Sequence, residues 1–350
     1  MNRLIPLICA LLSAFALPAC SAKFHQALKE NHFLYVAGAS EIIGYYISPD
    51  SGILTETTRI ATSGIIYSLV ADPQGTFLFA GSISTQIVHV YRVNPLNGAL
   101  TADSSLNAGA QIQSMTIDET GTRLFLSFNT ANSAILSFGR TTTGLVIADT
   151  LSNVLNMTPI PGTPFTFSMT LLGAGIATHR LNDSTSVATL TQAITVATSS
   201  HAVDPSGNWE LINSTSLGGI NRYRINRETG AFSLTGFTTN NPGPILFDPS
   251  GNWLICRESI AVALVSRPFN SATGEVGTAT ATLPLSAVSG PLIFHPTEAW
   301  AYWLNAGNAL NSAAFNSSTG EFTTLQSISI GGSSGSAKQI ALVRARSEVR

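Results

Sequence analysis

Short apolar runs separated by turn residues follow one another along almost the whole chain. Residues 65–71 form one such run, and the turn Asp72-Pro-Gln-Gly75 connects it to a second run at residues 76–80. A third run at residues 87–93 leads into another turn, and a fourth follows at residues 99–102. Runs of this length bounded by Gly, Pro, Asn and Asp predict short antiparallel strands. Apolar spacing typical of helices is nearly absent.

The turn after the third run recurs seven times. Each copy has a polar residue, three further residues and then usually Gly, and the fifth positions are 46, 46, 42, 44, 44 and 46 residues apart. These fifth positions are Gly52, Gly98, Gly144, Ser186, Gly230, Gly274 and Gly320. So constant a period indicates stacked supersecondary units. The Gly supplies the left-handed conformation that a bulged hairpin needs.

A second turn motif lies upstream of most of these hairpins. Its first residue is Asp at positions Asp72, Asp118, Asp204 and Asp248, and His295 takes this place in a variant copy. Asp can cap the turn backbone, a following Pro presets φ, and Gly completes the turn. Each period therefore contains four antiparallel strands, lettered a to d from the first to the fourth, which is the pattern of a β-propeller blade.

The repeat predicts an all-β protein, a seven-bladed β-propeller of four-stranded antiparallel blades. The expected b strands lie near Phe33, Phe77, Leu124, Phe165, Trp209, Trp253 and Ala301. The first blade lacks a preceding a strand, whereas a spare apolar segment, residues 338–343, follows the last blade. Pairing the two would close the ring and remove its open edges. We therefore place the propeller at residues 33–343 and a C-terminal tail at residues 344–350.

The first residues are typical of a targeting segment. An apolar stretch, residues 4–16, is too short to span a bilayer. It leads to Leu17-Pro-Ala-Cys20, which resembles the lipobox of bacterial lipoproteins, whose Cys is lipidated. This predicts a signal peptide at residues 1–19 and a tether at residues 20–32, with an ordinary secretory signal as the alternative. The expected location is the bacterial cell envelope, on a lipid anchor, and Ser21 favours the outer membrane.

Composition narrows the partners and cofactors. Only 10% of the residues are charged and the formal net charge is −2, so no basic face for nucleic acid is expected. Once Cys9 has left with the signal peptide and Cys20 is lipidated, Cys256 has no partner for an internal disulfide, and its apolar neighbours predict a packing role. The His residues lack metal-ligand spacing, and no glycine-rich phosphate loop opens a helix, so no metal or cofactor is predicted.

The strand order assigns the turns to two faces. The a–b and c–d turns carry the repeated motifs and lie on one side, the motif face. The d–a and b–c loops lie on the opposite side, the mouth face, around the central channel. The mouth loops differ from blade to blade, and ligands are expected there, because binding residues concentrate on variable loops held by a rigid scaffold.

The turn sequences resemble one protein family. Val203-Asp-Pro-Ser-Gly-Asn-Trp209 and Phe247-Asp-Pro-Ser-Gly-Asn-Trp253 are similar to the seven-bladed lactonase family, the 6-phosphogluconolactonase-like propellers. Leu34-Tyr-Val-Ala37 is similar to the Tyr-Val-Thr-Asn repeats of surface-protein propellers. The resemblance covers about residues 33–343. It implies a seven-bladed fold and metal-independent hydrolysis of a lactone at the channel mouth.

The side chains that this resemblance implies for catalysis are absent. The lactonases carry a His about five residues before an a–b turn. At that offset this chain has Tyr67, Gln113, Ser199, Gly243 and Gly290, with Lys338 on the closing strand. The family also often has Glu after the Asn that matches Asn305, where this chain has Ala306. Because lactone hydrolysis needs a base to activate water, the sequence predicts no lactone hydrolysis and no catalytic residue.

Polar side chains near the mouth remain candidates for ligand binding. They are Tyr67, Gln113, His201, Arg257, Glu258 and Lys338. Arg257 and Glu258 are expected in a mouth loop as a charged pair, which a local ion pair explains equally well. His201 could face the channel or the blade interior. The leading hypothesis is an envelope binding or scaffolding module for a small polar ligand or an envelope protein, and the alternative is a lactone hydrolase.

Overall fold

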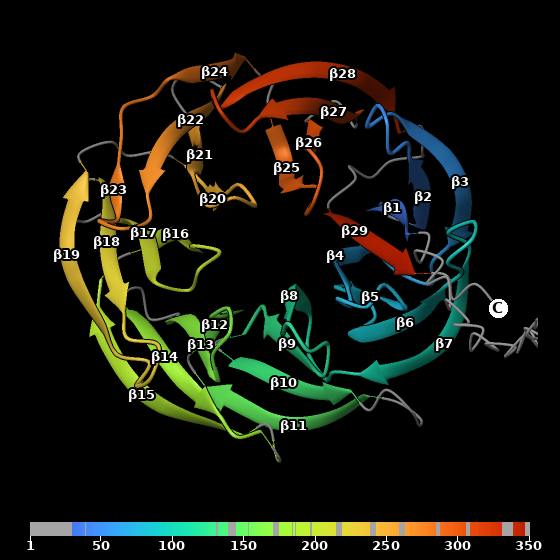
Figure 1. Cartoon of the computed structure of the whole chain (residues 1–350). Coiled ribbons are helices and arrows are strands. Elements are labelled where there is room, and N and C mark those ends of the chain that lie inside the picture. The colour runs from blue at the N-terminus through green and yellow to red at the C-terminus, as the bar shows by residue number, and fades with distance from the viewer. Residues whose placement is uncertain are drawn as a thin grey trace, which may run out of the picture.

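The computed structural model describes residues 30–346 apart from short segments. The segments left out are residues 39, 131, 139–144, 153, 171–174, 184, 186, 197, 215–218, 239–242, 259–262, 285–287, 306–308 and 331–338. The described residues form strands and no helix, arranged in seven small antiparallel sheets around a central opening (Figure 1). The prediction of an all-β propeller arrangement is confirmed. No helix among these residues is long and apolar enough to cross a membrane.

The strands of each sheet follow one another from the central opening outward. The first sheet is β29 (Gln339–Arg346), β1 (Glu30–Ala37), β2 (Glu41–Ile47) and β3 (Leu54–Ala61). The second is β4 (Ile66–Ala71), β5 (Phe77–Ser82), β6 (Ile87–Val93) and β7 (Leu100–Asn107). The third is β8 (Ile112–Ile117), β9 (Arg123–Phe128), β10 (Asn132–Phe138) and β11 (Leu145–Ser152). The fourth is β12 (Val154–Pro159), β13 (Phe165–Thr170), β14 (Gly175–Leu181) and β15 (Ala188–Thr195).

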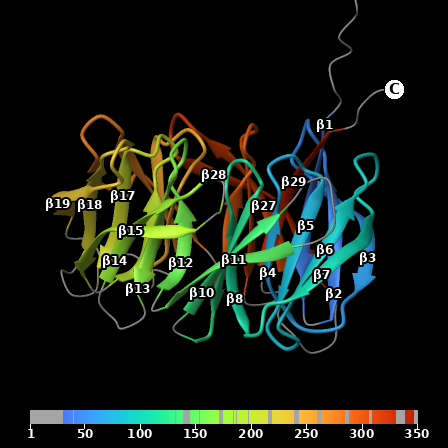
Figure 2. The same cartoon turned by 90° about the horizontal axis from the view of Figure 1, so that it is seen from below.

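The remaining three sheets have the same order. The fifth is β16 (Thr198–Val203), β17 (Trp209–Ser214), β18 (Gly219–Ile225) and β19 (Phe232–Thr238). The sixth is β20 (Ile245–Phe247), β21 (Trp253–Glu258) and β22 (Ala263–Asn270), whose outer edge pairs with β23 (Glu275–Val276) and β24 (Ala281–Pro284). The seventh is β25 (Val288–Phe294), β26 (Trp300–Asn305), β27 (Ala309–Asn316) and β28 (Glu321–Ser329). Figure 2 shows the sheets standing side by side around the ring.

The first sheet contains both ends of the described chain. Strand β29 pairs antiparallel with β1, from Glu30 opposite Arg346 to Ala37 opposite Gln339. This pairing begins three residues before the expected start of the propeller and ends three residues beyond its expected end. The buried side chains of Ile340 and Val343 join the cores on the two faces of this sheet.

The a–b turns are capped as their sequence predicts. A carboxylate oxygen of Asp72 accepts hydrogen bonds from the backbone N–H of Thr76 at 2.7 Å and of Phe77 at 2.6 Å. In the variant copy, Nδ1 of His295 accepts a bond from the N–H of Glu298 at 3.0 Å. Satisfying buried turn amides in this way explains why an acceptor side chain recurs at this position.

Five of the c–d turns in the described part of the chain contact an aromatic ring of the neighbouring sheet, at Gly52, Gly98, Gly230, Gly274 and Gly320. At Gly274, where φ is +74°, an added Cβ would lie 2.5 Å from the Trp209 ring of the preceding sheet. Trp209 Nε1 also donates a hydrogen bond to the carbonyl of Ser271 in that turn, at 2.8 Å. Gly52 likewise lies against the ring of Trp300, so the first and seventh sheets meet in the same way. The repeated Gly thus serves packing between sheets as well as turn geometry.

The substitution Gly274→Ala should therefore destabilise the fold more than the same change at Gly109. Both glycines have positive φ, but a Cβ at Gly109 would meet no atom within 4 Å. Both variants carry the backbone strain of Ala at positive φ. In Gly274→Ala the clash with Trp209 lowers the free energy of unfolding by about 1–3 kcal/mol more, as overpacking of a well-packed site does. Chemical unfolding of both variants measures the difference. Equal losses would contradict the packing role.

Candidate functional site

Four consecutive inner strands carry a β-bulge near the mouth face. The pairing register shifts between Ile66 and Ser68, between Ile112 and Ser114, between Leu155 and Met157, and between Thr198 and Ser200. The extra residues are Tyr67, Gln113, Asn156 and Ser199, which together make up the bulge ring. Bulges redirect side chains and are common next to binding and catalytic sites. The bulge ring is therefore the best-supported candidate site of the mouth face.

Asn156 connects two sheets at this level. Its Oδ1 accepts a hydrogen bond from Oγ of Ser114 at 2.7 Å, and its N–H donates to Oγ of Ser127 at 2.8 Å. Its φ is +46°, and Gln86 in a b–c loop on the mouth face has a φ of +60°. In the part of the chain that the structure describes, these are the two residues other than Gly with positive φ. Such strain persists where the surroundings enforce it, often at functional sites.

The sequence offset located three of the four members of the bulge ring, Tyr67, Gln113 and Ser199, and missed Asn156. Tyr67 and Gln113 were predicted ligand-binding residues, and both are half-buried at their bulges. In the fourth sheet the same offset falls on Leu155, whereas the bulge falls on Asn156. The a–b turn there starts at Ile160 and lacks the Asp that marks the other turns. The sequence feature that could have indicated the bulge is Asn156 itself, because Asn tolerates the left-handed region better than most residues.

The proposed charged pair in the sixth sheet is not a loop feature. Arg257 and Glu258 are the last two residues of strand β21, opposite Leu264 and Ala263 of β22, so their expected place in a mouth loop is wrong. The Arg257 carbonyl accepts a 2.5 Å hydrogen bond from the N–H of Gly243, where a Cβ would lie 2.7 Å from that oxygen. Lys338 lies outside the described residues.

His201 lies between the fourth and fifth sheets, next to a buried carboxylate that the sequence pattern did not indicate. Its Nδ1 is 2.7 Å from Oε1 of Glu210, and its Nε2 is 3.5 Å from Oγ1 of Thr158. The ring stacks near Phe167 at a centroid distance of 5.4 Å. The His201 side chain is 8% exposed and that of Glu210 is fully buried. His201 therefore faces the packed interface between two blades.

Burial and the imidazole act on Glu210 in opposite directions. Burial raises the pKa of Glu210, because an ionised carboxylate loses its hydration there, whereas the charge and hydrogen bond of His201 lower it. The net direction is upward. Oε2 of Glu210 has no hydrogen-bond partner among the described residues. A buried polar group in this condition is costly for the fold and calls for an explanation.

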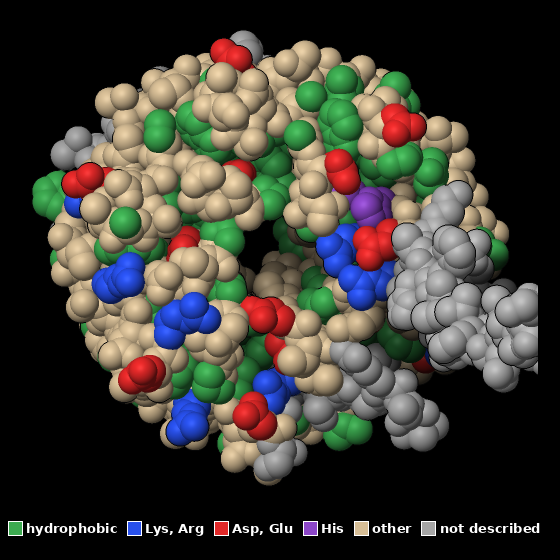
Figure 3. Space-filling view, in the orientation of Figure 1, with side chains coloured by type: hydrophobic (Ala, Val, Ile, Leu, Met, Phe, Trp, Pro, Cys, Tyr) green, Lys and Arg blue, Asp and Glu red, His purple; other side chains and the backbone are tan. Residues whose placement is uncertain are grey.

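A second imidazole pair lies on the motif face. Nε2 of His295 is 2.6 Å from Nδ1 of His32, and Glu30 contacts both Nε2 of His32, at 3.6 Å, and Arg346, at 2.8 Å. Figure 3 shows a purple imidazole patch beside Lys or Arg and Asp or Glu side chains on this face. Burial, and then the charges of His32 and Arg344, lower the pKa of His295 to about 4. His295 is thus neutral at neutral pH.

Acid should destabilise the protein through this pair. Because the folded-state pKa of His295 lies below its ordinary value of 6.5, stability is full above pH 6.5 and is lost as the pH falls towards about 4. The substitution His295→Asp restores the residue of the other turns and places a negative charge beside His32 and Arg344. We expect a smaller loss of melting temperature between about pH 7 and pH 4.5 in this variant. An unchanged loss would contradict the assignment.

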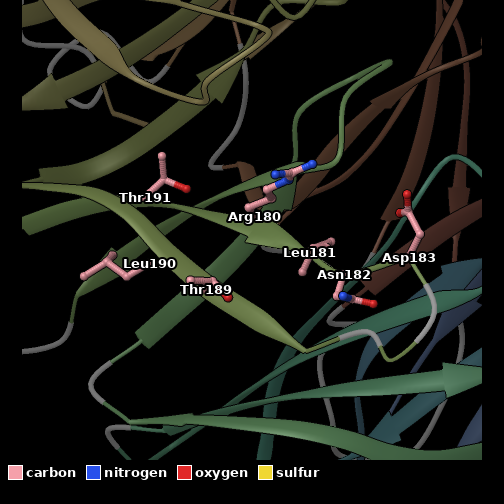
Figure 4. A pocket seen from close by; sticks show the side chains of 7 residues that line it. All are labelled: Arg180, Leu181, Asn182, Asp183, Thr189, Leu190 and Thr191. Atoms are coloured by element: carbon pink, nitrogen blue, oxygen red, sulfur yellow. The ribbon is translucent and has the colours of Figure 1, made fainter.

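One hollow of the surface lies away from the mouth face. Figure 4 shows a pocket at the c–d hairpin of the fourth sheet, lined by Arg180, Leu181, Asn182, Asp183, Thr189, Leu190 and Thr191. Its side chains come from one hairpin at the outer edge of the ring, away from the channel. Within the described ranges no group of three or more His, Cys, Asp and Glu side chains could hold a metal ion.

The family resemblance inferred from the turns is confirmed. The family model described as lactonase, 7-bladed beta-propeller, matches residues 22–118. A candidate 6-phosphogluconolactonase from Bacteroides uniformis has a similar structure, with a TM-score of 0.78, 12% identity, and coverage of 90% of this chain and 99% of that one. The periplasmic gluconolactonase PpgL of Pseudomonas aeruginosa has a TM-score of 0.76, 15% identity and the same coverages. No curated protein sequence matches. At these identities the structures show a shared fold.

Proposed function

We propose that the mouth face binds a small polar ligand of the sugar or sugar-lactone class. The observation that carries this proposal is the bulge ring, which places an uncharged polar residue at the same level of four neighbouring inner strands. Hydroxyl and amide groups both donate and accept hydrogen bonds, which suits the hydroxyl groups of a sugar. The names of the structural neighbours PpgL and the Bacteroides uniformis protein suggest the ligand class.

A thermal-shift panel tests this binding. The purified protein is melted with glucono-δ-lactone, gluconate and glucose, and at least one should raise the melting temperature. A ligand at one hundred times its Kd adds about 2.7 kcal/mol to the stability of the folded state. The double variant Gln113→Ala/Asn156→Ala should lose the shift, whereas Gln74→Ala on the motif face should keep it. A panel without any shift would contradict the proposal.

Hydrolysis of a lactone is the second candidate function. It is favoured by the contact of His201 with Glu210, because a carboxylate beside Nδ1 holds an imidazole in the orientation of a base. The family resemblance points to the same chemistry.

We also propose that the propeller has seven blades closed by β29 and is anchored in the envelope through Cys20. The pairing of β29 with β1 supports closure, since it leaves neither chain end as an open sheet edge. The lipobox-like Leu17-Pro-Ala-Cys20 supports the anchor. Closure and anchoring are compatible, because Glu30, which lies near the end of the tether, is on the motif face, opposite the mouth.

Replacing the anchoring residue should release the protein. In cells that express the full chain, Cys20→Ala should move the protein from the membrane fraction to the soluble fraction, because lipid chains supply most of the membrane affinity of such a protein. Fractionation followed by intact-mass measurement checks this expectation, with Cys256→Ala as the matched control. Membrane association of a mature Cys20→Ala protein would contradict the anchor.

A further inference from the structure

One boundary between neighbouring sheets lacks the aromatic contact that other boundaries share. Five residues after the first residue of the a–b turn, four sheets have an aromatic ring that contacts the c–d glycine of the next sheet; these rings belong to Phe165, Trp209, Trp253 and Trp300. The third sheet has Arg123 at this position, and the c–d turn of the fourth sheet has Ser186 in place of the glycine. Ring and glycine are therefore replaced together at the boundary between the third and fourth sheets, which we call the Arg123 boundary.

An ion pair takes the place of the aromatic ring at the Arg123 boundary. Nη2 of Arg123 is 3.1 Å from Oδ1 of Asp183 and donates a 3.3 Å hydrogen bond to the carbonyl of Asn182, both in the c–d turn of the fourth sheet. The Asp183 side chain is 85% exposed, whereas that of Arg123 is 11% exposed. Among the ion pairs between described residues, this one joins two sheets and the others lie within one sheet. Ion pairs with an exposed partner contribute little stability, and salt weakens them.

The apolar packing of the Arg123 boundary is also limited. Its cluster of buried side chains consists, in the described part of the chain, of Phe125, Val154, Met157 and Leu181. The cluster between the sixth and seventh sheets includes two buried indole rings, those of Trp253 and Trp303. Because large aromatic rings remove the most apolar area from water, a cluster with a single phenyl ring holds the third and fourth sheets together less strongly.

The mouth end of the Arg123 boundary is formed by Asn156 of the bulge ring. Its Oδ1 accepts a hydrogen bond from Ser114, and its N–H donates to Ser127. Both serines belong to the third sheet, whereas Asn156 belongs to the fourth. Its φ of +46° is a conformation that persists only while the surroundings enforce it. Separation of the two sheets would release this strain and carry Asn156 away from Gln113, the bulge residue of the third sheet.

We propose that the propeller ring opens at the Arg123 boundary, and that the ion pair of Arg123 and Asp183 is a latch that salt loosens. Opening breaks the ion pair and moves Asn156 away from Gln113, so the bulge ring is complete only while the latch is closed. A ligand that bonds to both residues binds the closed state better and shifts the equilibrium towards it. This effect on a ligand rests on the binding proposed above for the mouth face, whereas the opening itself does not.

Backbone amides that donate across a boundary report on its opening. Across the Arg123 boundary, the amides are those of Gly162, bonded to Glu119 at 2.6 Å, Ala188, bonded to Asp149 at 2.9 Å, and Asn156, bonded to Ser127 at 2.8 Å. Across other boundaries, the control amides are those of Leu54, Met115 and Phe232, whose acceptors are the uncharged side chains of Gln326, Ser68 and Gln192, each at 2.9 Å. A difference between the two sets is therefore specific to the Arg123 boundary.

Hydrogen exchange of these six amides tests the latch. Exchange in the purified protein is followed by NMR at about 0.1 M and about 1 M NaCl. We expect about two- to fivefold faster exchange of the three Arg123-boundary amides at the higher salt, and no change in the controls. Asp183→Asn, which alters an exposed side chain, should give the faster exchange already at the lower salt. Arg92→Gln is the matched control, because it removes an exposed ion pair, with Asp103, that lies within one sheet.

Restoring the ring and glycine of the other boundaries should close the latch permanently. The variant Arg123→Trp/Ser186→Gly should exchange slowly at the three amides whatever the salt concentration. An equal salt response of both sets of amides would overturn the latch. So would an Asp183→Asn protein that exchanges as the natural protein does at the lower salt.

A last measurement separates the latch from the proposed binding. With the thermal-shift ligand bound, the three Arg123-boundary amides should exchange more slowly than in the free protein. A ligand that binds without slowing them would overturn the link between latch and bulge ring and leave the proposed binding intact. A panel without any bound ligand would contradict the proposed binding, and the salt response would still decide whether the ring opens at this boundary.

Discussion

A chain that ends at Gly332 should lose its cooperative unfolding transition. This truncation removes β29, which pairs with β1 over eight positions, from Glu30 opposite Arg346 to Ala37 opposite Gln339. It also removes the buried side chains of Ile340 and Val343 from two cores. Because β1 would then expose a long apolar edge, we expect aggregation and rapid proteolysis in addition. Circular dichroism melting and limited proteolysis measure both effects.

A chain that ends at Arg346 is the matched control. It keeps every residue of β29, so it should melt as the full chain does. If the chain ending at Gly332 also melted cooperatively at an unchanged temperature, the pairing of the two chain ends would not be what holds the ring together. The proposed closure would then be wrong.

The second large effect is expected when one member of the buried pair of His201 and Glu210 is replaced. In His201→Met, Glu210 remains fully buried without its imidazole partner, and removing one partner of a buried pair costs about 3–5 kcal/mol. The double variant His201→Met/Glu210→Leu restores the residues of the third sheet, Met115 and Leu124. Replacing a buried pair by well-packed apolar groups is neutral or stabilising by about 1–4 kcal/mol. The double variant should therefore be more stable than either single variant.

The pH dependence of stability provides an independent test of the same pair. The folded-state pKa of Glu210 is raised above its ordinary value of 4.5. The folded protein therefore holds this proton more readily than the unfolded chain, and stability contributed by Glu210 falls as the pH rises above 4.5. The double variant should lose this part of the pH dependence. If the stability losses of His201→Met and Glu210→Leu added up to that of the double variant, and the pH dependence did not change, the two residues would not be coupled.

The repeat predicted the fold because its turns depend on local chemistry. The Asp72 cap and the Gly274 turn are both determined by residues close in sequence, and each recurs with a constant period. The bulge positions Tyr67 and Gln113 followed from their distance to such a turn. The bulge at Asn156 was not predicted, because the turn after it begins with Ile160, which carries no capping side chain.

The parts that the sequence did not predict depend on contacts between sheets. Glu210 follows Trp209 in a strand whose other residues are mostly apolar, and nothing local shows that its side chain meets His201. Aligning the blades by their turns would have singled out both residues, since the matching positions are uncharged. Arg257 and Glu258 were misplaced because the end of strand β21 extends further than the apolar run that marks it.

Titration calorimetry tests the central claim most directly, that the bulge ring holds a polar ligand. The ligand with the largest thermal shift is titrated into the natural protein, into Gln113→Ala/Asn156→Ala and into Gln74→Ala. Loss of two sets of hydrogen bonds should weaken binding at least tenfold in the double variant, since about 1.4 kcal/mol corresponds to tenfold, and should leave Gln74→Ala unchanged. The same Kd in all three proteins would contradict the account.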